Sequence, residues 1–273
     1  MTKTFRDYEY EGWLERAATY DAITAVTNQA IDPILATLET LEGLRILEVA
    51  SGPGHLSGEA FQRGAEVDGI DFASTMVAQA RAAYPEVRFS EGDAEQLSFS
   101  EGCFDGVVCA FGLLHLARPE LAIAEAFRVL RPGGRYSYTV WCPPEQGGDF
   151  FGFLGGAIQT HADPAITLPE GPPFYRFADR EIASAVLGEA GFRDIRFSTV
   201  PVYWYGTAPE QAVEVIYKAT VRTKMMLEAQ RPEVVEKIHR TIVEGVEQFR
   251  EDDHFRIALP AFLATAVKPT DAA

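Results

Sequence analysis

The stretch ILEVASGPG, residues 46–54, decides the fold of this chain. Its apolar residues predict a short strand over Arg45–Ala50, followed by the loop Ser51-Gly52-Pro53-Gly54 and a helix that begins at His55. Glycines in such a loop let the backbone approach a ligand closely, and the N-terminus of the next helix offers free N–H groups. The stretch therefore predicts a strand, loop and helix that together bind a ligand.

Acidic residues follow the next two predicted strands. Asp71 ends the strand predicted over residues 65–71, 17 residues after Gly54, where its carboxylate can accept both hydroxyls of a ribose. The segment Gly92-Asp93-Ala94-Glu95 follows a strand predicted over residues 87–90, and it is placed to contact an adenine amino group. Together with the glycine loop, these acids favour a nucleoside-type cofactor. The alternative is a tight turn with an aspartate that caps a helix.

Strands and helices alternate through the rest of the first half. Strands are predicted over residues 104–114 and 135–141, and helices over residues 55–63, 74–84 and 119–130. This alternation from about residue 44 to 142 is typical of βαβ units around a parallel sheet, so we predict an α/β, Rossmann-like, doubly wound fold. A helix over 179–190, a sixth strand over 193–200 and a final strand over 255–267 are predicted to follow.

The second half contains two segments of different character. Residues 143–177 are rich in proline and glycine with interleaved aromatic residues, which favours a lid over a site more than a disordered linker. Residues 209–250 predict two helices that part near Arg231-Pro232, and we interpret them as a cap inserted before the final strand. The glycine pairs Gly147-Gly148 and Gly155-Gly156 are candidate hinges of the lid.

The charge and cysteine content of the chain exclude several classes of partner. The 273 residues carry 24 basic and 40 acidic side chains, a net charge of −16, which disfavours nucleic acid and anionic membrane surfaces because both attract basic proteins. No run of 18 uncharged apolar residues and no leader-like start occur, so we expect a cytoplasmic protein without a membrane span. The three cysteines, at 103, 109 and 142, lack the spacing of a metal site, and we expect no metal.

A set of motifs in fixed order resembles a known family. The set comprises Tyr20-Asp21, ILEVASGPG (46–54), GIDFASTMVAQAR (69–81), GDAEQLSF (92–99), FDGVVCAFGLLHL (104–116) and EAFRVLRPGGR (125–135). It resembles the class I S-adenosylmethionine-dependent methyltransferases, and among them the branch similar to the C-methyltransferases of ubiquinone and menaquinone biosynthesis. The resemblance covers residues 15–142 and 176–192. It implies a seven-stranded, mostly parallel sheet whose last strand is antiparallel.

The resemblance also implies which residues bind S-adenosylmethionine. Glu48 would order the glycine loop beside the methionine amino group, Asp71 would bind the ribose, and Asp93 would accept a hydrogen bond from the adenine amino group. The complete implied set is Glu48, Gly52, Gly54, Asp71, Phe72, Met76, Asp93, Ala94, Ala110 and Phe111. Ala50 stands where the family usually has its first glycine.

Catalysis and acceptor binding are expected from residues outside that set. Methyl transfer is an in-line displacement that positioning and desolvation accelerate, and it needs a base only when the acceptor loses a proton. His115, just after the fourth strand, is the candidate base, and Tyr20 resembles the family tyrosine that covers the cofactor. Candidate acceptor-pocket residues are His161, Tyr203, Tyr205 and Arg176. Each of these six also has a structural reading, as a packed histidine, a core aromatic or a capping cation.

These observations predict a single methyltransferase domain over residues 1–273. Its parts are an N-terminal helical cover (1–42), a cofactor-binding core (44–142), a lid (143–178), a helical cap (206–253) and the final strand (255–267). The predicted reaction methylates an oxygen or carbon atom of a small metabolite, because the motif typical of planar-amine methyltransferases is absent after the fourth strand. A homodimer is left open.

Two other functions remain open from the sequence. A non-catalytic or repurposed S-adenosylmethionine-binding protein could keep the same fold, and Ala50 favours this reading because it departs from the family pattern. An NAD-dependent oxidoreductase could use the same glycine turn with Asp71. Ser57, at the position of the third glycine of a dinucleotide fingerprint, and the segment around Asp93 both disfavour NAD.

Overall fold

The computed structural model describes residues 3–270, so the ends of the predicted single domain, residues 1–2 and 271–273, lie outside the described residues. The chain divides into two compact units. The first unit contains the chain up to Thr27 together with Cys142–Gly171 and Pro201–Pro260. The second unit contains Asn28–Trp141, Pro172–Val200 and the chain from Ala261 onward. The predicted cover and the predicted lid are each divided between the two units.

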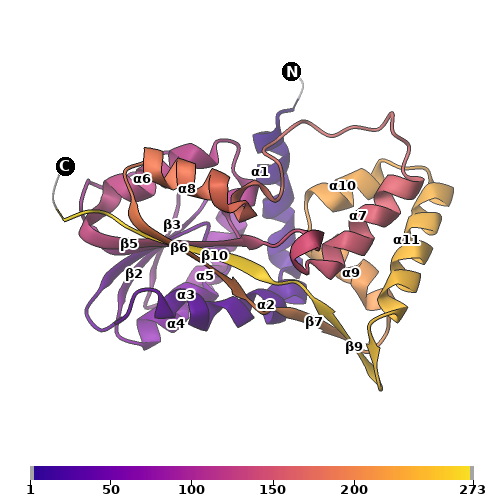
Figure 1. The fold of residues 1–273 in the computed structure, drawn as a ribbon, viewed down its shortest axis with the longest axis horizontal. Helices are drawn as coiled ribbons and strands as arrows, with labels where there is room; N and C mark the ends of the chain where they lie inside the picture. The colour runs from indigo at the N-terminus through magenta and orange to yellow at the C-terminus, as the bar shows by residue number, and fades with distance from the viewer. Residues whose placement is uncertain (1–2, 271–273) are drawn as a thin grey trace. The chain divides into compact units, whose positions relative to one another are not determined.

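The second unit is built on a seven-stranded sheet (Figure 1). Its strands are β1 (Arg45–Val49), β2 (Glu66–Asp71), β3 (Arg88–Glu91), β4 (Phe104–Ala110), β5 (Leu130–Trp141), β6 (Arg193–Val200) and β10 (Ala261–Val267). Their order in space is β3-β2-β1-β4-β5-β10-β6. The pairs from β3 to β5 are parallel, whereas β10 runs antiparallel to both β5 and β6. The predicted fold class is therefore confirmed, including its antiparallel last strand.

Helices cover both faces of this sheet. They are α3 (Ile31–Ala36), α4 (His55–Gln62), α5 (Ser74–Ala83), α6 (Pro119–Val129) and α8 (Arg180–Glu189), with the short 3₁₀ helices η2 (Asn28–Ala30), η3 (Leu113–His115) and η5 (Arg176–Ala178). Figure 1 shows α6 and α8 on one face and α3 and α4 on the other. β4 is almost uncharged because it is covered on both faces, and Val107, Val108 and Cys109 are fully buried.

The first unit combines helices with a small antiparallel sheet. Its helices are α1 (Phe5–Arg16), η1 (Ala17–Thr19), α2 (Asp21–Thr27), η4 (Pro144–Gln146), α7 (Asp149–His161), α9 (Glu210–Ala219), α10 (Arg222–Glu228) and α11 (Pro232–Glu247). Its strands are β7 (Tyr203–Gly206), β8 (Arg250–Glu251) and β9 (His254–Ala258), in the order β7-β9-β8. α11 packs against α7 and α9, and its buried Ile238, Ile242 and Val246 follow the spacing of one helix face.

Two sequence predictions for this region are wrong. The final strand predicted over residues 255–267 is two strands, β9 and β10, which belong to different sheets. They part at Leu259-Pro260, where proline has no N–H for a sheet ladder and Leu259 N–H instead donates to the carbonyl of Val202 at 2.8 Å. The predicted pair of cap helices is three helices, because the extended backbone of Thr220 ends α9 before α10 begins.

No helix within residues 3–270 is both long enough and apolar enough to cross a membrane.

Candidate active site

The glycine loop that follows β1 has an unusual backbone. Ala50, Gly52 and Gly54 have φ angles of +55°, +52° and +84°, in the left-handed region that glycine adopts without strain. Gly54 is the N-cap of α4, so the loop leads directly into the N-terminus of that helix. A Cβ built on Gly52 would meet no atom within 4 Å, so open space lies beside the loop at this position. The loop thus offers backbone N–H groups next to space for a ligand.

Asp71, at the carboxyl end of the neighbouring strand β2, fixes this loop. Its Oδ2 accepts the N–H of Gly52 at 2.9 Å, and its Oδ1 accepts the N–H of Ala73 at 2.9 Å. The side chain is buried, which raises its pKa to about 6, although these two hydrogen bonds and the charge of His115 act to lower it. Each carboxylate oxygen can accept a further hydrogen bond, so Asp71 can hold the loop and a ribose together.

Glu48 is a second buried carboxyl group beneath the loop. Its Oε2 accepts hydrogen bonds from the backbone N–H of Ser57, at 3.0 Å, and from the Ser57 hydroxyl. The pKa of Glu48 is raised to about 8. Burial is the largest cause and the charge of Asp71 adds to it, while the two hydrogen bonds from Ser57 act in the opposite direction. The two buried carboxyl groups thus lie close enough for the charge of Asp71 to act on Glu48. A cationic ligand would therefore supply charge that this site lacks.

The residues predicted to contact adenine lie at the ends of β2 and β3. Met76 in α5 is buried, and the partly exposed Phe72 directly follows Asp71. Asp93 forms a local turn in which its Oδ1 accepts the N–H of Glu95 at 2.9 Å, and Ala94 within that turn is buried. These positions place acidic and apolar groups along the same edge of the sheet as the glycine loop.

β4 ends beside β1 and carries the remaining predicted residues of this edge. Phe111, directly after Ala110, has a φ of +54°, and its N–H donates to the carbonyl (3.0 Å) and to Oγ1 (3.2 Å) of Thr139 in β5. Its ring stacks on Trp141, with the centroids 4.1 Å apart and the planes at 25°. His115 lies on η3 and is close enough to Asp71 for its charge to lower the pKa of that carboxyl group.

Sequence reasoning missed three groups at this edge. Thr139 and Trp141 lie near the carboxyl end of β5. The sequence predicted this strand but assigned no function to the residues at its end. Because parallel strands end at the same edge of a sheet, the position of Trp141 at the end of that strand was the available signal. Glu95, which is buried, accepts bonds from the backbone N–H and Nε of Arg118 and ties the Asp93 turn to the start of α6.

The site's groups fit S-adenosylmethionine. The Ser51 hydroxyl in the glycine loop is buried and has no hydrogen-bond partner among the described residues. An unsatisfied buried hydroxyl is costly, so a bound polar group beside it would be stabilising. The open space at Gly52, the two buried carboxyl groups and the aromatic residues Phe72 and Phe111 suit a ligand that combines ribose hydroxyls, an amine, a sulfonium and an adenine ring.

The other predicted site residues are distributed over both units. In the first unit, His161 Nε2 lies 2.9 Å from Oγ1 of Thr241, and the ring of Tyr20 lies 6.0 Å from that of Trp13. The guanidinium of Arg256 lies 3.8 Å from the centre of the Tyr203 ring. Tyr205, also in the first unit, is 55% exposed. These contacts leave the predicted acceptor-side roles as predictions.

Arg176, in the second unit, forms a salt bridge with Glu120 at the start of α6. Its guanidinium also lies 5.4 Å from the centre of the Phe177 ring. Both contacts fit the structural reading of this residue, and its predicted role with an anionic acceptor stays a prediction.

Comparison with known proteins agrees with this site. Residues 47–138 match the model of the family described as a methyltransferase domain. A demethylmenaquinone methyltransferase of Beutenbergia cavernae is 32% identical over 200 residues, which cover 66% of this chain and 81% of that protein. The demethylmenaquinone methyltransferase of Thermus thermophilus is 40% identical over 166 residues, covering 54% of this chain and 74% of that protein.

A solved structure shares the fold at lower identity. Phosphoethanolamine N-methyltransferase 2 of Haemonchus contortus, in complex with S-adenosyl-L-methionine, superposes with a TM-score of 0.58 at 18% identity, covering 98% of this chain and 60% of that one. The family match and the sequence relatives rule out the NAD alternative: the cofactor is S-adenosylmethionine, and the enzyme methylates a small molecule. The chain belongs to the class I S-adenosylmethionine-dependent methyltransferases, of the menaquinone and ubiquinone C-methyltransferase type.

Proposed function

We propose that the acceptor is a flat ring of the quinone type and that the methyl group is transferred to a ring carbon. The observation that carries this proposal is the stacked pair Phe111 and Trp141 at the carboxyl ends of β4 and β5. Both rings are nearly buried, and Phe111 adopts a strained backbone conformation to hold its place. A flat aromatic acceptor packs favourably against such a wall. The names of the two relatives, demethylmenaquinone methyltransferases, support the same class of acceptor.

The cofactor roles follow from the contacts of the loop. S-adenosylmethionine supplies a methyl group that its sulfonium activates for displacement. We assign the ribose hydroxyls to Asp71, the methionine amino group to the neighbourhood of Glu48, and the adenine amino group to Asp93. Gly52 and Gly54 keep the loop free of side chains, while Phe72, Met76 and Ala94 provide apolar packing. The positive charge of the bound cofactor would favour the ionised form of both buried carboxyl groups.

We assign His115 as the base. A ring carbon that gains a methyl group must lose its proton, and a neutral imidazole can accept it. His115 is held on η3 by its backbone N–H, which donates to the carbonyl of Gly112 at 3.0 Å. η3 directly follows β4, whose carboxyl end lies at the same edge of the sheet as Asp71, and this supports a place for the imidazole on the cofactor side.

Acceptor contacts are also proposed for the first unit. Tyr20 would cover the cofactor, and His161, Tyr203 and Tyr205 would contact the acceptor, with Arg176 of the second unit. The net charge of −16 supports an enzyme without a nucleic-acid partner. A cytoplasmic location stays a prediction. A homodimer stays a prediction, and light scattering on the purified protein would decide it.

The test is an assay with a short-chain demethylmenaquinol. The purified enzyme is incubated with S-adenosylmethionine and the reduced acceptor, and the product is located by mass spectrometry and carbon NMR. We expect one methyl group on a ring carbon. A matched phenolic acceptor whose ring carbons are blocked should give no product. A product methylated on the hydroxyl oxygen would contradict the assignment to a ring carbon. Methylation of the blocked phenol but not of the demethylmenaquinol would contradict it as well.

A further inference from the structure

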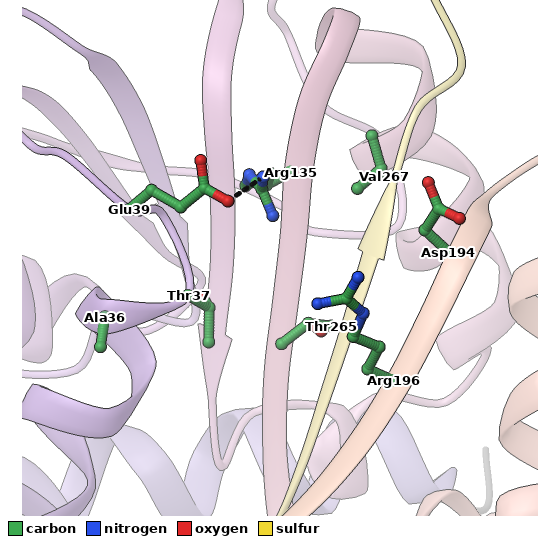
Figure 2. A pocket seen from close by; sticks show the side chains of 8 residues that line it. All are labelled: Ala36, Thr37, Glu39, Arg135, Asp194, Arg196, Thr265 and Val267. Carbon is green, nitrogen blue, oxygen red and sulfur yellow. Dashed lines mark hydrogen bonds and ion pairs between the residues drawn. The ribbon is translucent and has the colours of Figure 1, made fainter.

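A cavity lies in the second unit, away from the cofactor-binding edge of the sheet; we call it the second cavity to separate it from the cofactor site. Its volume is about 250 Å³, and its lining residues are Ala36, Thr37, Glu39, Arg135, Asp194, Arg196, Thr265 and Val267 (Figure 2). Arg135 pairs with Gly106 near the start of β4, whereas the cofactor-binding edge is at the other end of that strand. The cavity therefore opens at the amino ends of the parallel strands, and the cofactor site does not use it.

The cavity contains two acidic and two basic side chains. Glu39 and Arg135 form a salt bridge, drawn as the dashed line in Figure 2. Arg196 pairs with Thr265 through the backbone, but the exposed side chains of Arg196 and Asp194 form no hydrogen bond or salt bridge within residues 3–270. Figure 2 shows the Arg196 side chain reaching from β6 across β10 toward Thr265. The cavity thus carries one uncompensated cation and one uncompensated anion.

The backbone is distorted where this charge pair originates. β6 pairs with β10 through Thr265 opposite Arg196 and Val267 opposite Arg193, so two β6 residues face the single residue between them. Asp194 is one of these two, and its φ is +50°. Such bulges change the direction of a side chain and often adjoin functional sites. Glu39, on the other side of the cavity, also has a positive φ, +65°.

We propose that this cavity binds a small zwitterion whose carboxylate pairs with Arg196 and whose ammonium group pairs with Asp194. A simple anion would meet the carboxylates of Asp194 and Glu39, and a simple cation would meet the guanidinium groups of Arg196 and Arg135. Only a molecule with both charges complements the cavity. Thr265 also lines the cavity and offers a hydroxyl as a further hydrogen-bonding partner, whereas the Thr37 hydroxyl already bonds the carbonyl of Ile34 and the hydroxyl of Ser137, each at 2.6 Å. The ligand class is therefore an amino-carboxylate of a few carbon atoms.

The test uses three probes of nearly equal size on the full-length protein: 4-aminobutanoate, butanoate and butylammonium. Binding is followed by amide chemical shifts of the cavity residues in an NMR titration. We expect 4-aminobutanoate to shift the amides of Thr37, Arg135, Arg196 and Thr265 and to bind at least tenfold more tightly than either singly charged probe. Equal binding of butanoate and 4-aminobutanoate, or no shifts at these residues, would overturn the proposal.

Two variants test separately how the carboxylate end and the ammonium end of the ligand are bound. Arg196→Gln should weaken 4-aminobutanoate binding at least tenfold, and Arg240→Gln, at an exposed position in α11, should leave it unchanged. Asp194→Asn keeps a residue that tolerates a positive φ, so the fold is preserved. It should remove the preference for 4-aminobutanoate over butanoate. Retention of this preference in Asp194→Asn, or unchanged binding in Arg196→Gln, would rule out the assigned pairing.

Discussion

Ala50 adopts a backbone conformation that usually requires glycine, and its neighbour explains how the methyl group is accommodated. A Cβ built on Gly112 would lie 2.6 Å from Cβ of Ala50 and 2.8 Å from Sγ of Cys109. The methyl group of Ala50 therefore lies against Gly112, which follows β4. Because Gly112 has no side chain, the methyl group has room. The departure from the family's usual glycine at residue 50 thus depends on the glycine at 112.

This arrangement predicts a coupled pair of substitutions. Gly112→Ala should destabilise the protein by about 2–3 kcal/mol through overpacking, and Ala50→Gly should stabilise it by about 1 kcal/mol by relieving the positive φ. In the double variant, Ala50→Gly should stabilise the protein by more than it does in the parent, because it also removes the clash between the new Cβ at residue 112 and the Cβ of Ala50. Denaturant unfolding measures all three free energies.

The control is Gly188→Ala in α8, where an added Cβ meets no atom within 4 Å. This substitution should be neutral or stabilising, since alanine favours helix. Strict additivity of Ala50→Gly and Gly112→Ala would refute the proposed contact.

Glu48 and Asp71 make the stability of the cofactor-free protein depend on pH. Burial raises the pKa of Glu48 from 4.5 to about 8 and that of Asp71 from 3.8 to about 6. Between the unfolded and folded values, the folded state holds more protons than the unfolded state, so the free energy of unfolding falls as the pH rises. The decrease in the free energy of unfolding that Glu48 causes extends from about pH 4.5 to about pH 8, and above that pH Glu48 causes no further decrease.

Glu48→Gln should remove most of this decline between pH 6 and pH 8, a difference on the order of 2 kcal/mol. Urea unfolding at four pH values measures it. Glu66→Gln, at an exposed position of β2, serves as the control and should keep the slope of the parent protein. A parent protein that is equally stable at pH 6 and pH 8, measured without cofactor, would contradict this prediction.

At the scale of the elements, the ends of three strands carry the chemistry. β2 supplies Asp71 to the cofactor, and the short η3 after β4 supplies His115. Asp71→Ala should abolish binding of S-adenosylmethionine because it removes the ribose acceptor and releases the Gly52 N–H. His115→Ala should spare binding and lower kcat about 10²-fold or more. Calorimetry and single-turnover assays separate the two effects, and full turnover by His115→Ala would show that another group takes the proton.

The end of β5 provides a separate prediction for the acceptor. Trp141→Leu should raise KM for the quinone-type acceptor about tenfold, with little change in the affinity for S-adenosylmethionine. Trp141→Phe keeps an aromatic ring on Phe111 and should restore most of the affinity. If both variants bind the acceptor as the parent protein does, the stacked pair is structural only.

At the scale of the whole molecule, the ten residues of the predicted cofactor-binding set all lie in the second unit, whereas Tyr20 and most acceptor-side candidates lie in the first. Hydrogen exchange can test this division. Addition of S-adenosylhomocysteine should slow exchange at residues 48–54, 71–76 and 110–115, because the ligand contacts these backbone segments. Residues 36–39, which line the second cavity, should be unaffected. Slowed exchange confined to the first unit would contradict the assignment of the cofactor site.

The sequence by itself determined the parallel part of the sheet in the second unit and the loop at its edge. The strand, glycine loop and helix around residues 46–62 and the acid at the end of β2 are as the residues predicted, and the antiparallel last strand of the sheet is as the family resemblance implied. The features predicted from the residues depend on local signals: apolar runs of strand length, glycines at a turn, and acids at strand ends. Local signals are read from neighbouring residues, so a single sequence contains them.

Only the tertiary structure decided the rest. The apolar run over 255–267 does not reveal that β9 and β10 join different sheets, because β9 pairs with β7 and β10 pairs with β5 and β6, all of which lie far earlier in the chain. The contact between Ala50 and Gly112, the stack of Phe111 on Trp141, and the cavity between Glu39 and Arg196 likewise join distant segments. Their geometry is set by packing across the sheet, which no local pattern encodes.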